Sequence, residues 1–174
     1  IQWRRTLHAN PEVGFNTAST EKLIVDELGA MGADEIRHGN GKRGIVALIK
    51  GKKPGKVLGI RADYDALNMT EDTGLPFAAA NGNMHACGHD AHAAMLLGTA
   101  KILTECRDEL QGTVKLIFQP SEEDGKGAPA MIEDGLFENP AMDGIIGLHI
   151  GSLWKGFKAG EAGYRFGALM AASD

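Results

Sequence analysis

Cysteine is scarce in this sequence: the 174 residues include only two, Cys87 and Cys106. Two cysteines cannot build the disulfide framework of a small secreted domain, so we expect a reducing compartment, the cytoplasm. The chain also lacks any run of about 18 or more apolar residues, which argues against a helix that crosses a membrane. No basic segment followed by an apolar one opens the sequence, so a secretory leader is not indicated.

An excess of positive charge is absent as well. Lys and Arg number 18 against 23 Asp and Glu, and the formal net charge is -5. This balance does not favour binding to nucleic acid or to an anionic membrane. Hydrophobic residues make up 43% of the chain, enough for the core of one ordinary domain.

Hydrophobic periodicity predicts helices and strands in alternation. Apolar residues at helical spacing predict helices at residues 2–7, 17–31, 89–109 and 127–134. Short runs rich in β-branched residues predict strands at 44–49, 56–62, 113–118 and 144–149, with further short strands near 157–159 and 164–166. The first two strands are joined by a glycine turn at 51–55, so we expect them to be neighbours. The alternation predicts an α/β sandwich with helices on both faces of a mostly parallel sheet.

Polar side chains follow three of these strands. Asp63 and Asp65 come after one strand, Glu122 and Glu123 after another, and His149 ends a third. In open α/β sheets, active sites lie beyond the carboxyl ends of the strands. We therefore expect these residues to share one edge of the sheet.

The densest cluster is the segment HACGHD at 85–90, followed by His92. Cys87 and His89 are two residues apart just before a helix, and Gly88 gives the backbone freedom to turn both side chains toward one ion. A thiolate and an imidazole suit zinc and other borderline divalent ions. The alternative interpretation is a capped helix start with incidental histidines.

The adjacent carboxylates of Glu122 and Glu123 suggest two different roles. One can bind a metal while its neighbour faces the bound water as general base. The alternative is a pair of glutamates on a solvated face. His149, similarly, is either a ligand or an ordinary residue at the rim of the core.

Asp63 and Asp65 alternate on an extended segment, so one of them should point toward the site. Either carboxylate can orient a ligand by accepting an imidazole N–H. Ordinary turn chemistry is the alternative explanation for both.

Six segments together resemble one known family. They are LHANPEVGF, IRADYDAL, MHACGHDAHAAMLLG, GTVKLIFQPSEE, GAPAMIEDGLF and GLHIG. The chain resembles the amidohydrolase branch of the aminoacylase/carboxypeptidase-G metallopeptidases, which includes hippurate hydrolases, N-acyl-amino-acid amidohydrolases and indole-acetyl-amino-acid hydrolases. The resemblance implies a zinc-exopeptidase-like three-layer sandwich and hydrolysis of the amide bond of N-acyl amino acids or small peptides.

The resemblance also implies roles for individual residues. Two divalent metal ions, zinc or manganese, are expected, with Cys87 bridging them and His89, Glu123 and His149 as further ligands. Glu122 is implied as the catalytic base. Asp63 falls where the family keeps an acid that orients the site.

The resemblance further implies a domain organisation. Residues 1–174 match the N-terminal part of the catalytic domain, whereas the lid or dimerisation domain and the C-terminal part of the catalytic domain are absent. The full-length form is expected to be a homo-oligomer. Two other functions stay open: a metal-binding module without turnover, and an α/β enzyme with Cys87 as a thiol nucleophile.

Overall fold

The computed structural model describes residues 1–38, 44–151, 156, 158 and 160–164. Its helices are α1 (Gln2–Ala9), α2 (Ala18–Met31), α3 (His89–Glu105) and α4 (Gly127–Glu133). Its strands are β1 (Glu35–His38), β2 (Ile45–Lys50), β3 (Lys53–Asp63), β4 (Gln111–Gln119) and β5 (Gly144–Gly147). The short strands expected near 157–159 and 164–166 fall on segments that lie partly outside the described residues. Within the described ranges, no helix is both long and apolar enough to cross a membrane.

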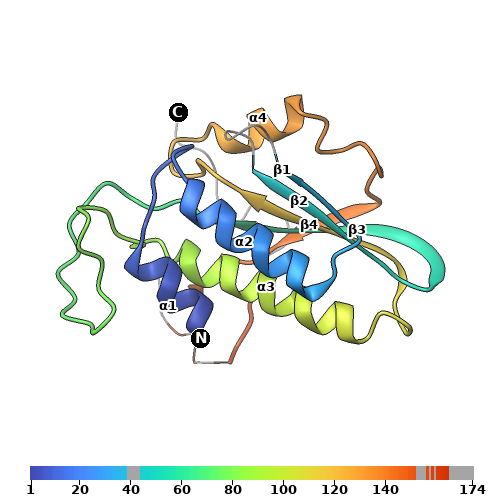
Figure 1. Cartoon of the computed structure of the whole chain (residues 1–174), viewed down its shortest axis with the longest axis horizontal. Coiled ribbons are helices and arrows are strands. Elements are labelled where there is room, and N and C mark those ends of the chain that lie inside the picture. The colour runs from blue at the N-terminus through green and yellow to red at the C-terminus, as the bar shows by residue number, and fades with distance from the viewer. Residues whose placement is uncertain (39–43, 152–155, 157, 159, 165–174) are drawn as a thin grey trace.

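The elements form three layers. A single sheet separates α1, α2 and α3 on one face from α4 on the other (Figure 1). The main core lies between the sheet and the larger helical layer, where Ile24, Leu28 and Leu97 pack with Ile45 and Phe118. A smaller cluster, Ile117, Met131 and Leu136, lies on the side of α4. The expected α/β sandwich with helices on both faces is confirmed.

The sheet is mixed, which corrects the expectation that it is mostly parallel. Its order is β1-β2-β4-β3-β5, and β3 pairs in parallel with β4 and with β5. The β1–β2 and β2–β4 pairs are antiparallel. The connection from β1 to β2 is far too short for the crossover that a parallel pair requires, so these two strands form a hairpin.

The strands β2 and β3 are consecutive in the sequence but are not neighbours, because β4 lies between them. The expectation that they pair was therefore wrong. The turn that joins them wraps around the start of β4, where the backbones approach closely. A Cβ on Gly51 would lie 2.1 Å from the carbonyl oxygen of Leu110, so only glycine fits there.

The carboxyl ends of the three parallel strands meet at one edge. Asp63 at the end of β3 pairs with Gln119 at the end of β4, and Arg61 pairs with Gly147 at the end of β5. Residues that follow these strands are therefore delivered to a common region. The first turn of α3 lies in the same region.

Candidate metal centre

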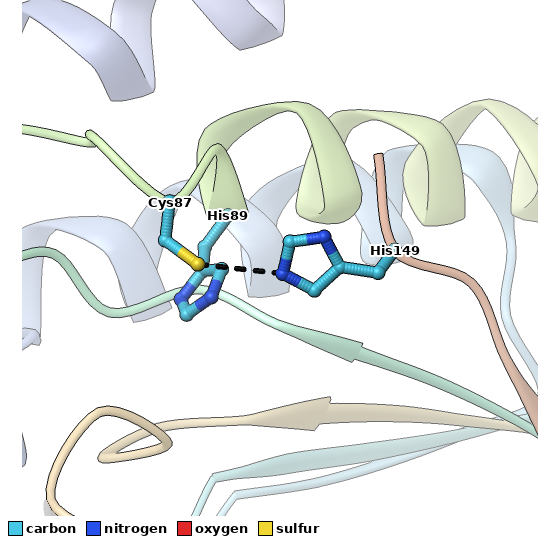
Figure 2. Close-up of side chains that lie close together, drawn as sticks. All are labelled: Cys87, His89 and His149. Carbon is cyan, nitrogen blue, oxygen red and sulfur yellow. Dashed lines mark hydrogen bonds between the residues drawn. The ribbon is translucent and has the colours of Figure 1, made fainter. Parts of the chain in front are cut away.

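The start of α3 brings two side chains of the HACGHD segment together. Gly88 is the N-cap residue with φ 91, a left-handed conformation that favours glycine. A Cβ at Gly88 would lie 2.1 Å from the Cδ1 atom of Ile150, so the Ile150 side chain would have to move for any larger residue. The turn at Gly88 lets Cys87 and His89 point to the same place, although they stand on either side of it (Figure 2).

His149 reaches these two residues from the far side of the site. It lies two residues after β5, and its Nε2 atom is 3.3 Å from the Sγ atom of Cys87. One donor atom from each of Cys87, His89 and His149 lies within 4.8 Å of the other two (Figure 2). A sulfur and two imidazole nitrogens at such spacing are a suitable donor set for a borderline divalent ion.

His89 is fully buried, and its hydrogen bonding leaves one nitrogen for a ligand. Its Nδ1–H donates to the backbone carbonyl of Asp65 at 2.9 Å. This bond sets the tautomer and leaves the Nε2 lone pair free. Among the described residues Nε2 has no hydrogen-bond partner, and carboxylate oxygens of Glu122 and Glu123 lie 3.7 and 3.9 Å away.

The electrostatics at His89 favour a cation. Burial opposes a charge on this imidazole, but the hydrogen bond to Asp65 and the charge of Asp63 raise its pKa above the ordinary value. Surroundings that favour a proton on the Nε2 atom of His89 also favour a metal ion at that atom. The orphaned Nε2 atom and its surrounding sulfur, nitrogen and oxygen donors therefore fit a metal.

The turn after β4 aims both glutamates at the site. Ser121 is buried and has φ 53, an unusual value for a residue other than glycine. The carboxylate of Asp65 accepts the backbone N–H groups of Glu122 at 3.0 Å and of Glu123 at 3.3 Å. The Glu122 side chain is 38% exposed and the Glu123 side chain 23%, so the Glu122 side chain is the more accessible to solvent, although Glu123 with its backbone included is the more exposed residue. The interpretation of this pair as a solvated face is not supported, because both carboxylates approach His89.

Asp63 supports the site through contacts with His92 and Arg61. His92 donates its Nδ1–H to Asp63 at 2.6 Å, and the Nη1 atom of Arg61 lies 2.7 Å from the same carboxylate. Burial alone would raise the pKa of Asp63, but the His92 hydrogen bond and the charges of His89 and Arg61 lower it to about 2. The Nε2 atom of His92 in turn accepts the backbone N–H of Ile150 at 3.0 Å, which fixes the segment that follows His149.

Two residues, His92 and Asp65, hold more of the site in place than the sequence indicated. His92 follows His89 by three residues on the same helix, and that spacing places both on one face, so it was a usable signal. Asp65 accepts from His89 through its carbonyl and from both glutamates through its carboxylate. The sequence identified Asp65 only as an equal alternative to Asp63, because the backbone acceptors and donors of a fold are not visible in the order of residues.

The thiol of Cys87 is not prepared for attack as a nucleophile. Burial, reinforced by the carboxylates of Glu123 and Glu122, raises its pKa to about 12. Reactive cysteines instead have a lowered pKa in an electropositive environment. Burial also raises the pKa of Glu123, so a cation between sulfur and carboxylate relieves both groups. The arrangement favours a metal ligand over a thiol nucleophile.

The fold and this donor set define an α/β protein with a candidate metal centre at the carboxyl ends of its parallel strands, and comparison with known proteins gives the family. The model of the peptidase family M20/M25/M40 matches residues 59–163. The chain therefore belongs to this peptidase family.

Similar proteins agree with this assignment. The chain is 42% identical to an N-acyl-L-amino acid amidohydrolase of Geobacillus stearothermophilus, over 100% of its own length and 46% of that protein. It is 42% identical to a hippurate hydrolase of Campylobacter jejuni, over 98% of its own length and 43% of that protein. A Bacillus subtilis structure described as a dinuclear metal-binding peptidase superposes with a TM-score of 0.80 at 45% identity, covering 85% of this chain and 41% of that one. The chain thus spans less than half the length of these relatives.

Proposed function

We propose that the protein hydrolyses the amide bond of N-acyl amino acids or small peptides, with two divalent metal ions held by Cys87, His89, Glu123 and His149. The observation that carries the proposal is the buried Nε2 atom of His89, which has no hydrogen-bond partner among the described residues and faces sulfur, nitrogen and carboxylate donors. Relatives named as an amidohydrolase and a hippurate hydrolase support the substrate class.

The two glutamates differ in their surroundings, and this difference suggests their roles. The Glu123 side chain is the more buried of the two and interacts with the thiol of Cys87, which would suit a metal ligand beside the Cys87 sulfur. The Glu122 side chain is the more exposed of the two and lies 3.7 Å from His89, which suits a base that meets water. When bound, the two ions supply Lewis-acid polarisation of the amide carbonyl and a more acidic water. Glu122 takes the proton of the attacking water and delivers it to the leaving nitrogen.

The residues around these groups hold them in place. The Asp65 carboxylate keeps the backbone of Glu122 and Glu123 at a set distance from His89. Asp63 acts through His92, which holds the segment carrying His149. We assign Asp63 a positioning role in catalysis on this basis.

Several finer properties belong to the same proposal. A thiolate with imidazoles and a carboxylate suits zinc, and manganese is the alternative. Both cysteines are free thiols, which is consistent with a reducing cytoplasm. We further propose that residues 1–174 form the N-terminal part of the catalytic domain. A lid or dimerisation domain and the remaining catalytic segment complete the protein in this proposal. The complete protein is a homo-oligomer that acts on small molecules.

A matched pair of variants tests the division of roles in the full-length protein. Glu122→Gln and Glu123→Gln make the same chemical change at adjacent residues. Metal content is measured by mass spectrometry after dialysis, and hydrolysis is followed on a panel of N-acetyl and N-benzoyl amino acids. We expect Glu122→Gln to lose turnover and keep its metal, and Glu123→Gln to lose metal.

Three results would contradict parts of the proposal. Equal loss of metal in both variants would remove the division of roles between the glutamates. A metal-loaded wild type that hydrolyses none of the panel would favour the binding module without turnover. Full activity after chelation, abolished by thiol alkylation, would favour Cys87 as a nucleophile.

A further inference from the structure

A network of polar and charged side chains, buried except for part of Arg4, lies next to the metal centre but outside it. His8, near the end of α1, is 3% exposed. Its Nδ1 atom lies 2.8 Å from the carboxylate of Asp90, and its Nε2 atom lies 3.1 Å from the carboxylate of Glu71. Arg4 donates from Nε to the same Asp90 oxygen at 2.8 Å. We call Arg4, His8, Glu71 and Asp90 the His8 network.

The partners of His8 come from the two sides of the segment that bears Cys87 and His89. Asp90 directly follows His89 in the first turn of α3. Glu71 belongs to an irregular loop whose ends are closed by backbone hydrogen bonds between Leu67 and Met84. The metal-binding segment leaves this closed loop directly after Met84.

Glu71 also organises its own loop. Its carboxylate accepts the backbone N–H of Ala79 at 2.7 Å and the hydroxyl of Thr73. The Glu71 side chain is fully buried, although the loop around it is largely exposed. Both ring nitrogens of His8 lie within hydrogen-bonding distance of a carboxylate, Nε2 of Glu71 and Nδ1 of Asp90. One side chain thus connects α1, the loop before Cys87 and the helix that begins with His89.

We propose that His8 is a positioning residue for the metal centre: by joining Glu71 to Asp90, it ties the loop that precedes Cys87 to the helix that begins with His89. The inference rests on the proposed metal site and adds to it a residue that binds no metal. Burial favours this role over a merely solvated ion pair, because buried carboxylates need well-placed donors to be tolerated.

Cobalt(II) titration of the full-length, metal-free protein provides the test. The thiolate-to-cobalt absorption band reports ligation by Cys87, and competition with a chelator gives the affinity. His8→Leu removes both ring-nitrogen contacts at similar volume, and His8→Gln restores one polar contact. Loss of partners that orient ligands typically weakens metal binding about 10- to 100-fold. We expect a loss of at least about tenfold and a weaker band in His8→Leu, with partial recovery in His8→Gln.

Arg107→Leu is the matched control. Arg107 lies just beyond the other end of α3 and also makes two contacts, to Asp34 at 2.7 Å and to the carbonyl of Gly32 at 2.7 Å. Its loss should lower the melting temperature but leave cobalt affinity within about twofold of wild type, because the site is remote.

The outcomes separate this inference from the proposed function. Wild-type affinity and an unchanged band in His8→Leu overturn the positioning role alone, as does an equal loss in Arg107→Leu. A wild type without the thiolate band overturns the metal site and this inference with it. If His8→Leu does not fold, Glu71→Gln replaces it, and there too we expect weaker cobalt binding; unchanged binding overturns the role.

Discussion

Gly127 closes the turn that bears Glu122 and Glu123, and its replacement by alanine tests how firmly that turn is built. The backbone N–H groups of Lys126 and Gly127 both donate to the carbonyl of Ser121, at 3.2 and 3.0 Å. A Cβ on Gly127 would lie 1.6 Å from the carbonyl oxygen of Pro120. No flexible side chain is available to move away, because the obstructing atom is backbone.

The magnitude follows from these distances. The Pro120 peptide or the start of α4 must move by roughly 2 Å to reach van der Waals separation, which strains or breaks the two hydrogen bonds to Ser121. Overpacking of this kind and the weakened bonds together cost about 2–4 kcal/mol of the free energy of unfolding. For a domain of this size the melting temperature should fall by roughly 5–15 °C.

Thermal and urea unfolding of Gly127→Ala measure this loss, and cobalt titration shows whether Glu123 has moved. Gly98→Ala is the control, because Gly98 lies inside α3 with nothing within 4 Å of a built Cβ. That substitution should stabilise the protein by up to about 1 kcal/mol through helix propensity. A Gly127→Ala protein as stable as wild type, with unaltered metal affinity, would refute the reasoning.

Three further predictions concern stability and association. The pKa of Asp63 is lowered from 3.8 to about 2, so its ionised form adds about 2 kcal/mol to the free energy of unfolding, present above pH 4 and lost as the pH falls toward 2. In urea unfolding, Asp63→Asn should lack this dependence of stability on pH. An unchanged dependence contradicts the assignment. Lys115 is fully buried and donates to the carbonyls of Leu136, Glu138 and Pro140 at 2.6, 2.8 and 3.0 Å. In denaturant unfolding, Lys115→Met should therefore lower the free energy of unfolding by about 2–4 kcal/mol, and a loss below about 1 kcal/mol would show that water replaces the ammonium group. Ile145 and Ile146 are 49% and 51% exposed on the edge strand β5. A sample of residues 1–174 should therefore self-associate in light scattering, and Ile146→Lys should reduce the association. Equal association of the unaltered chain and the variant contradicts a role for this edge.

The sequence predicted the convergence of the polar residues better than the arrangement of the strands. Residues after β3, β4 and β5 converge because the ends of parallel strands share an edge, and this rule needs no knowledge of strand order. The glycine between Cys87 and His89 was a local signal for convergence, and the structure gives it the required left-handed conformation.

The order of the strands could not be predicted in the same way. A glycine turn between two strands normally indicates a hairpin, but here Gly51 passes over the start of β4, which is inserted between β2 and β3. That insertion depends on contacts between segments far apart in the chain. For the same reason the role of Asp65 was open, because its partners are backbone groups of Glu122 and Glu123 that only the fold brings near.

The position of His149 has a consequence for how the edge of the sheet is held. In the described part of the chain, β5 pairs with β3 alone, and all four of its residues are exposed. A cation shared by Cys87 and His149 would cross-link positions 62 residues apart, much as a covalent bridge does. Withdrawal of the ion should therefore release β5 before the rest of the sheet, and its amide protons should be the first to exchange with deuterated solvent.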